Sequence, residues 1–123
     1  MGVANKKKLL IVDNSPIIIE RLLETLKDHP VVKSLDAATD YDEAVAKLAD
    51  KTTDFVILDF HLNTKSGIDL LKFIVKEYPG IQTIVFSNLA DDNYFRLCKE
   101  IGATHCLDKS KDFELIPTLL ATT

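Results

Sequence analysis

Short apolar runs alternate along this chain with longer segments in which apolar residues recur every three or four positions. Each run is bounded by polar or turn-forming residues and is too short to make a helix of ordinary length. The runs occupy residues 8–13, 31–37, 54–59, 81–86 and 104–107. Continuous apolar runs of this length predict strands that are buried on both faces, as in a parallel sheet.

The periodic segments predict helices, and several begin at residues that suit a helix start. Ser15 can cap the first helix and Pro16 fits its first turn, while Gly102 suits the end of the fourth. The expected helices run from Pro16 to a stop at 29–30, from Asp40 or Asp42 to Leu48, from 68 to 78, from Asp91 or Asp92 to Gly102, and from Asp112 to Leu120. Five strand–helix pairs in succession predict an α/β domain with a doubly wound, five-stranded parallel sheet.

The length of 123 residues fits a single domain spanning residues 1–123, with residues 1–7 as a flexible tail. Hydrophobic residues make up 46% of the chain and its net charge is only −4, which excludes disorder over most of its length. No apolar run is long enough to span a membrane, and the N-terminus lacks the pattern of a signal peptide. A cytoplasmic protein is therefore expected, with no membrane partner. The mild acidic balance argues against nucleic-acid binding.

Polar residues with chemical potential follow four of the predicted strands. They are Asp13 and Asn14, Asp59 and His61, Ser87 and Asn88, and Lys109. Because ligands of open α/β sheets bind beyond the carboxyl ends of the strands, these side chains are expected to converge. Two carboxylates suit a hard cation such as Mg²⁺, a lysine and a hydroxyl can hold phosphoryl oxygens, and a carboxylate can accept a phosphoryl group. The pattern indicates metal-assisted phosphoryl chemistry.

Five motifs in this order resemble the response-regulator receiver family, the flavodoxin-like domains of two-component signalling. The motifs are residues 11–16, 56–59, 67–71, the strand ending at Ser87, and residues 102–109. The resemblance covers nearly the whole chain and implies a stand-alone receiver without a separate output domain. It also implies a regulator, not an enzyme, apart from catalysis of its own phosphorylation and dephosphorylation.

The resemblance assigns a role to each residue at the strand ends. It implies that Asp59 accepts a phosphoryl group from a phosphohistidine on a histidine kinase or phosphotransfer protein. It implies that Asp13 and Asp59 bind Mg²⁺ with the backbone carbonyl of His61, and that Ser87 and Lys109 bind the phosphoryl oxygens. The protein would then relay the phosphoryl group onward, or dock a downstream protein through the face formed by the fourth helix, fifth strand and fifth helix.

Several positions depart from the family pattern. Asn14 replaces the second acid of the usual pair, so a neutral oxygen stands where a metal ligand is normally charged and Mg²⁺ affinity is expected to fall. Asn88 is larger than the residue usual after the Ser/Thr, Cys106 replaces the usual aromatic residue of the fifth strand, and Ser110 replaces the frequent proline after Lys109. The departures at Asn14, Asn88 and Cys106 support an alternative, a receiver-like interaction module that works without phosphorylation. A nucleotide-binding enzyme is disfavoured because residues 13–16 contain no glycine.

Overall fold

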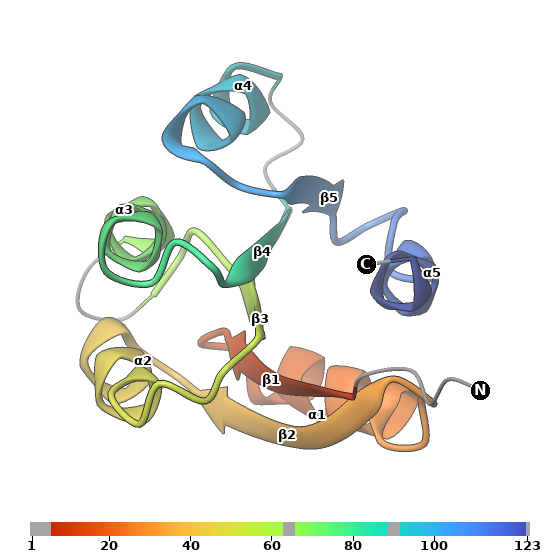
Figure 1. Cartoon of the computed structure of the whole chain (residues 1–123). Coiled ribbons are helices and arrows are strands. Elements are labelled where there is room, and N and C mark those ends of the chain that lie inside the picture. Colours follow the sequence, from red (N-terminus) through yellow and green to blue (C-terminus); the bar gives the residue numbers. More distant parts are fainter. Residues whose placement is uncertain (1–5, 63–65, 89–91, 123) are drawn as a thin grey trace.

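A computed structural model describes residues 6–62, 66–88 and 92–122. Strands and helices alternate along the chain (Figure 1). The elements are β1 (Lys7–Val12), α1 (Pro16–Leu26), β2 (Val32–Ala38), α2 (Tyr41–Leu48), β3 (Phe55–Leu58), α3 (Gly67–Glu77), β4 (Gln82–Ser87), α4 (Asp92–Ile101), β5 (His105–Asp108) and α5 (Leu115–Ala121).

All neighbouring strands are parallel, and the sheet order is β2-β1-β3-β4-β5. The chain therefore starts in the interior of the sheet, moves outward to β2, and then crosses back over β1 to reach β3. The expected doubly wound, five-stranded parallel sheet is confirmed. Every strand ends at the same edge, so the loops that follow the strands meet there.

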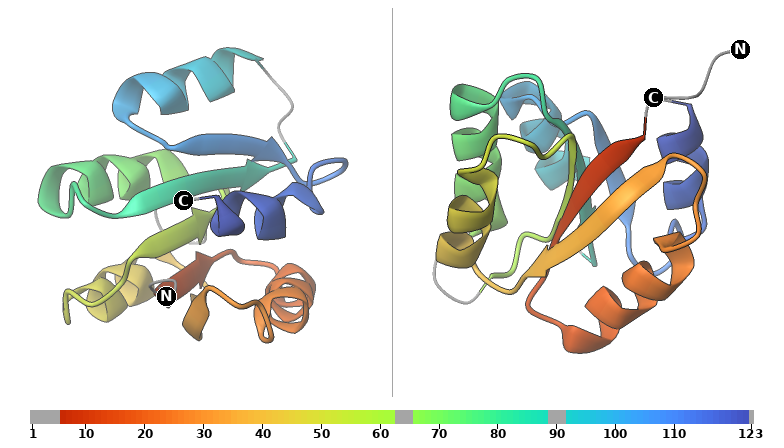
Figure 2. Two further views of the ribbon diagram at one scale, coloured as in Figure 1. Left: turned by 45° about the vertical axis from the view of Figure 1, so that its right-hand side comes forward. Right: turned by 60° about the horizontal axis from the view of Figure 1, so that its bottom comes forward.

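Helices cover both faces of the sheet. The helices α1 and α5 lie on one face, and α2, α3 and α4 on the other (Figures 1 and 2). The central strands are buried from both sides, and all four residues of β3 are buried. This explains the unbroken apolar runs in the sequence. Each fully buried aliphatic or aromatic side chain contributes roughly 1.5–3 kcal/mol relative to an exposed one.

The first helices begin where the sequence indicates. The Ser15 hydroxyl accepts the N–H of Ile18 at α1, and the Asp40 carboxylate accepts the N–H of Glu43 at α2. The C-terminal end of α4 is followed by Gly102, whose φ of +132° is strained for other residues. The longest helices in the described ranges have 11 residues, and none of the described helices is long and apolar enough to cross a membrane.

Two of the differences from the predicted boundaries have a clear cause in the hydrogen bonding. Lys7 belongs to β1 and not to a flexible tail, because its N–H donates to the Val31 carbonyl at 2.7 Å; residues 1–5 of the predicted tail lie outside the described residues. The last helix begins at Leu115, three residues later than expected. Asp112 does not cap it, because its carboxylate accepts the N–H of Asp108. Pro117 therefore falls in the first helical turn, where a proline is tolerated.

Candidate functional site

Backbone hydrogen bonds continue past the strand ends and hold the residues that follow them. The N–H of Asp13 donates to the Ala38 carbonyl at 3.1 Å, and the N–H of Asp59 donates to the Val12 carbonyl at 3.0 Å. The N–H of Lys109 donates to the Ser87 carbonyl at 3.0 Å. These bonds bring side chains from sequence positions far apart to one edge of the sheet, as the order of the elements predicts.

Lys109 joins the two aspartates. Its Nζ lies 2.6 Å from Asp13 Oδ2 and 3.1 Å from Asp59 Oδ2. The side chains are nearly inaccessible to solvent, with exposed fractions of 7% for Lys109, 3% for Asp13 and 5% for Asp59. The ammonium therefore bridges carboxylates that follow two neighbouring strands, β1 and β3. The structure thus brings three of the residues identified from the sequence into direct contact.

The backbone holds the remaining oxygen of each carboxylate. Asp13 Oδ1 accepts the N–H of Ser15 at 2.8 Å, and Asp59 Oδ1 accepts the N–H of Phe60 at 2.7 Å. Both carboxylates thus have one oxygen bound to an amide and the other to Lys109. This arrangement fixes the orientation of each carboxylate before any ligand binds.

The charges at this site do not balance, because one ammonium faces two buried carboxylates. Burial raises the pKa of Asp13 above its ordinary value of 3.8, and the nearby negative charge of Asp59 adds to the rise. Hydrogen bonds from Lys109 and Ser15 oppose that rise without cancelling it. A site of this kind favours an additional cation.

Gly67, the first residue of α3, lies directly against the backbone of Asp59. A Cβ at this position would come within 1.8 Å of the Asp59 carbonyl oxygen, so a side chain cannot fit without moving the backbone. The Gly67 N–H also donates to the Phe60 carbonyl at 2.8 Å. The sequence analysis uses Gly67 only as part of a motif and does not identify this contact. The signal in the sequence is the glycine placed after the capping residue Ser66.

The other predicted site residues occupy the same edge of the sheet. Ser87 is fully buried at the end of β4, whereas Asn14, His61 and Asn88 are exposed. Within the described ranges, no group of three or more His, Cys, Asp or Glu side chains could hold a metal. Any metal there would thus depend on the two aspartates with amide, carbonyl or water oxygens.

Two contacts connect α4 to the neighbouring elements. The Tyr94 ring packs against Phe60, with ring centroids 5.5 Å apart, and Cys106 Sγ donates to the Phe95 carbonyl at 3.7 Å. Because Phe60 follows Asp59 directly, an aromatic contact links the neighbourhood of Asp59 to α4.

The two cysteines are free thiols. Cys98 is fully buried, and burial raises its pKa to about 12. Burial also raises the pKa of Cys106, although Lys99 opposes that rise. Both sulfurs are therefore protonated at neutral pH, which disfavours reactions that need a thiolate.

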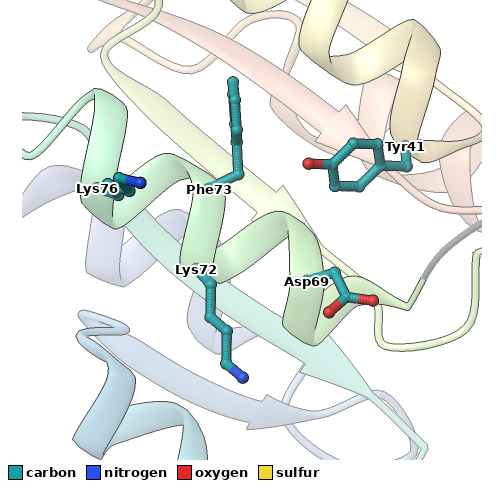
Figure 3. A pocket seen from close by; sticks show the side chains of 5 residues that line it. All are labelled: Tyr41, Asp69, Lys72, Phe73 and Lys76. Atoms are coloured by element: carbon teal, nitrogen blue, oxygen red, sulfur yellow. The ribbon is translucent and has the colours of Figure 1, made fainter.

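A separate groove of about 450 Å³ lies between α2 and α3 (Figure 3). It is lined by Tyr41, Asp69, Lys72, Phe73 and Lys76. The rings of Tyr41 and Phe73 are 6.2 Å apart at their centroids and define its apolar part. The groove includes none of the residues predicted to carry chemistry, so it does not coincide with the site at the strand ends.

Residues 9–121 match the family described as "Response regulator receiver domain". The chain is 39% identical over 114 residues to "Sensory transduction protein LytT" of Enterococcus faecalis, a match that covers 91% of this chain and 46% of the relative. It is 40% identical over 76 residues to a protein-glutamate methylesterase/protein-glutamine glutaminase of Pseudomonas savastanoi, covering 61% of this chain and 21% of the relative. The signal receiver domain of an HD domain-containing protein from Pseudomonas fluorescens superposes with a TM-score of 0.83 at 29% identity, covering 97% and 88% of the two chains.

This chain belongs to the response-regulator receiver family, and its phosphoryl-accepting regulatory role follows from that membership. It spans between about a fifth and a half of the length of these two curated relatives. The methylesterase match covers only 21% of that enzyme, so its activity is not transferred to this chain. The residues described above make up a receiver domain.

Proposed function

We propose that this receiver accepts a phosphoryl group on Asp59 and that Asp13, Ser87 and Lys109 assist the reaction. The observation that carries this proposal is the contact of Lys109 with both buried carboxylates, at 2.6 and 3.1 Å. An ammonium placed there can neutralise charge on phosphoryl oxygens. Ser87 is buried at the end of β4 and its carbonyl accepts the Lys109 N–H, which supports its hydroxyl as a second contact to the same group.

The proposed reaction is a transfer between two nucleophiles. A carboxylate oxygen of Asp59 attacks the phosphorus of a phosphohistidine. The O–P bond forms as the P–N bond breaks, and the imidazole nitrogen leaves with the bonding electron pair and takes up a proton. The product on this chain is an acyl phosphate. Because Asp59 Oδ2 contacts Lys109 while Oδ1 accepts the N–H of Phe60, the two oxygens are already differentiated.

The residues present fit a magnesium ion. The donor set is made of oxygens, which Mg²⁺ prefers, and the excess negative charge of Asp13 and Asp59 over Lys109 favours a cation. Asp13 and Asp59 would hold the ion, with the His61 carbonyl and, more weakly, the Asn14 amide oxygen. Bound there, Mg²⁺ would neutralise charge on the transferring phosphoryl oxygens.

The proposed partners are a histidine kinase or phosphotransfer protein upstream and a protein target downstream. The face formed by α4, β5 and α5 is the proposed docking surface for the target. Three large apolar side chains on its helices are exposed: Tyr94, Leu97 and Leu115. A cytoplasmic location remains part of this proposal and agrees with such partners.

The first test is phosphorylation by acetyl phosphate with Mg²⁺, followed by intact-mass measurement. The unaltered chain should gain the mass of one phosphoryl group, and the gain should be labile to base, as expected of an acyl phosphate. Asp59→Asn should abolish the gain. Asp54→Asn is the matched control, because Asp54 precedes the same strand at its opposite end; this variant should label normally.

Two results would contradict the assignment. Labelling that persists in Asp59→Asn would place the phosphoryl group elsewhere. Absence of labelling in the unaltered chain, under conditions that label another receiver, would favour the phosphorylation-independent interaction module. Family membership and the contacts of Lys109 disfavour that alternative.

A second test concerns the weak ligand at position 14. Asn14→Asp restores a negative charge beside Asp13 and should tighten Mg²⁺ binding by roughly 1–3 kcal/mol, or about 5–150-fold, by a screened Coulomb estimate. Titration of Mg²⁺ against both proteins measures the difference. Equal affinities would show that position 14 does not ligate the ion.

A further inference from the structure

The turn between β5 and α5 is held by hydrogen bonds to its own aspartates. Asp108 Oδ1 accepts the Ser110 N–H at 2.8 Å and the Ser110 hydroxyl at 2.6 Å. These two bonds hold the pKa of Asp108 below its ordinary value. Asp108 is only 3% exposed, so its carboxylate is part of the packed turn and not a freely solvated group.

A second aspartate closes the same turn from the other side. Asp112 Oδ2 accepts the N–H of Asp108 at 2.9 Å, and the Asp112 N–H donates to the Asp108 carbonyl at 2.8 Å. The backbone on both sides of Lys109 is therefore tied, at Asp108 and at Ser110. The spacing Asp-x-Ser-x-Asp in residues 108–112 is the sequence signature of this double closure.

Lys109 sits in the middle of this turn, and its own N–H donates to the Ser87 carbonyl at 3.0 Å. Its side chain then extends to Asp13 and Asp59. A lysine side chain has several freely rotating bonds and loses considerable entropy when it is fixed. Because the backbone is held on both sides of Lys109, the side chain has fewer conformations in which Nζ does not contact the carboxylates of Asp13 and Asp59.

We propose that Asp108, acting through the Ser110 hydroxyl and N–H, is a positioning residue for Lys109. This inference rests on the proposed function, in which Lys109 contacts the phosphoryl group. Asp108 itself touches neither the carboxylate of Asp59 nor a transferring group. The competing explanation is that Asp108 and Ser110 only stabilise the turn.

The test compares the unaltered chain with Ser110→Ala, Ser110→Thr and Asp108→Asn. Thr52→Ala is the matched control, because Asp50 Oδ1 accepts the N–H and hydroxyl of Thr52 in the same pattern, at 3.0 and 2.9 Å, in the turn before β3. The ¹⁵Nζ ammonium resonance of Lys109, assigned through its absence in Lys109→Met, reports the placement of the lysine directly. Initial rates of phosphorylation by acetyl phosphate with Mg²⁺ report the reaction.

In Ser110→Ala and Asp108→Asn, the Lys109 resonance should shift toward the position of solvated lysines or broaden. Their rates should fall about three- to tenfold, the scale of one lost hydrogen bond. Ser110→Thr should restore both readouts because it keeps the hydroxyl, and Thr52→Ala should leave both unchanged. If Asp108 and Ser110 only stabilised the turn, Ser110→Ala and Asp108→Asn would lower the urea midpoint of unfolding without shifting the Lys109 resonance.

The Lys109 resonance tests the positioning role of Asp108 whether or not the chain is phosphorylated. An unchanged Lys109 resonance in both Ser110→Ala and Asp108→Asn would overturn the inference, even if the rates fell. A shifted resonance in a chain that gains no phosphoryl group would support the positioning role and overturn the proposed function alone. If Asp108→Asn fails to fold, Ser110→Ala still decides, since Ser110 is exposed and its substitution leaves the buried carboxylate in place.

Discussion

Two clusters of lysine and aspartate lie at opposite ends of the sheet and differ mainly in burial. At the carboxyl end, Lys109 contacts Asp13 and Asp59, and all three side chains are at most 7% exposed. At the amino end, Lys8 Nζ contacts Asp50 Oδ2 at 2.8 Å, with side-chain exposures of 28% and 51%. The amino-end cluster also includes the Thr52 hydroxyl, 2.6 Å from Lys8 Nζ.

The pKa of an aspartate shifts in opposite directions in the two clusters. Burial raises the pKa of Asp13, whereas hydrogen bonds from Lys8 and Thr52 lower the pKa of Asp50 to about 2. The exposed cluster therefore stabilises the fold in a modest, ordinary way. The buried cluster holds an excess of negative charge, which weakens the fold and favours binding of a cation.

The largest effect should come from removing the buried ammonium. Lys109→Met leaves two carboxylates without a positive partner and should lower the free energy of unfolding at neutral pH by about 3 kcal/mol, the low end for an uncompensated buried charge. Lys8→Met, the matched change in the exposed cluster, should cost a small fraction of that amount. Urea denaturation in a chelating buffer measures both.

The double variant Lys109→Met with Asp13→Asn checks the cause of that loss. It should recover much of the stability, because only one buried carboxylate then remains. Equal losses in Lys109→Met and Lys8→Met would remove the contrast between the two ends of the sheet.

The second-largest effect should come from adding a side chain where the backbone is tightly packed, and the two ends of the sheet differ in this respect as well. Gly67→Ala should destabilise the fold by about 1–3 kcal/mol, because the new Cβ would meet the Asp59 carbonyl at 1.8 Å and push the Asp59 backbone away. Gly80→Ala is the control, since a Cβ there has no neighbour within 4 Å. Thermal unfolding compares the two, and a tolerated Gly67→Ala would mean that the contact with Asp59 relaxes easily.

The sequence predicts the order of elements and the residues at the strand ends because both depend on local patterns. Apolar runs that end in Asp13 and Asp59 mark strands whose loops meet at one edge of the sheet. Caps such as Ser15 and Asp40 also act within a few residues of their own position. The family resemblance adds the expected chemistry, and membership in the family is confirmed.

Features that depend on contacts across the fold were not predictable in the same way. The approach of Gly67 to the Asp59 carbonyl depends on how α3 packs against the end of β3. The packing of Tyr94 on Phe60 depends on the position of α4 relative to β3. In both cases tertiary geometry selects among partners that the sequence leaves equally available. The start of α5 was predicted too early for a local reason, because the Asp112 carboxylate accepts the N–H of Asp108, four residues earlier, instead of capping the helix.

A smaller effect, opposite in sign to the first two, should follow from Asp13→Asn. Because the folded-state pKa of Asp13 is raised, its charged form is disfavoured in the fold, and this penalty is present at neutral pH. The substitution should therefore raise the free energy of unfolding by about 1 kcal/mol at pH 7 without Mg²⁺. The gain should shrink as the pH falls through the raised pKa toward 3.8, where the unaltered carboxyl becomes neutral. A gain independent of pH would point to packing and not to charge.

The smallest effect should come from Asp50→Asn in the exposed cluster. This substitution should lower the free energy of unfolding, whereas Asp13→Asn should raise it. The pKa of Asp50 is lowered from 3.8 to about 2, so its charged form is favoured by folding, and its stabilisation is present above pH 3.8. The variant should be slightly less stable than the unaltered chain at pH 7, and the difference should fade between pH 3.8 and about 2. Salt should screen much of the effect, because Lys8 and Asp50 are accessible to solvent. Thermal unfolding in low and high salt measures it, and a salt-independent loss would show that the neutral hydrogen bonds to Thr52, not the charge pair, stabilise this end of the sheet.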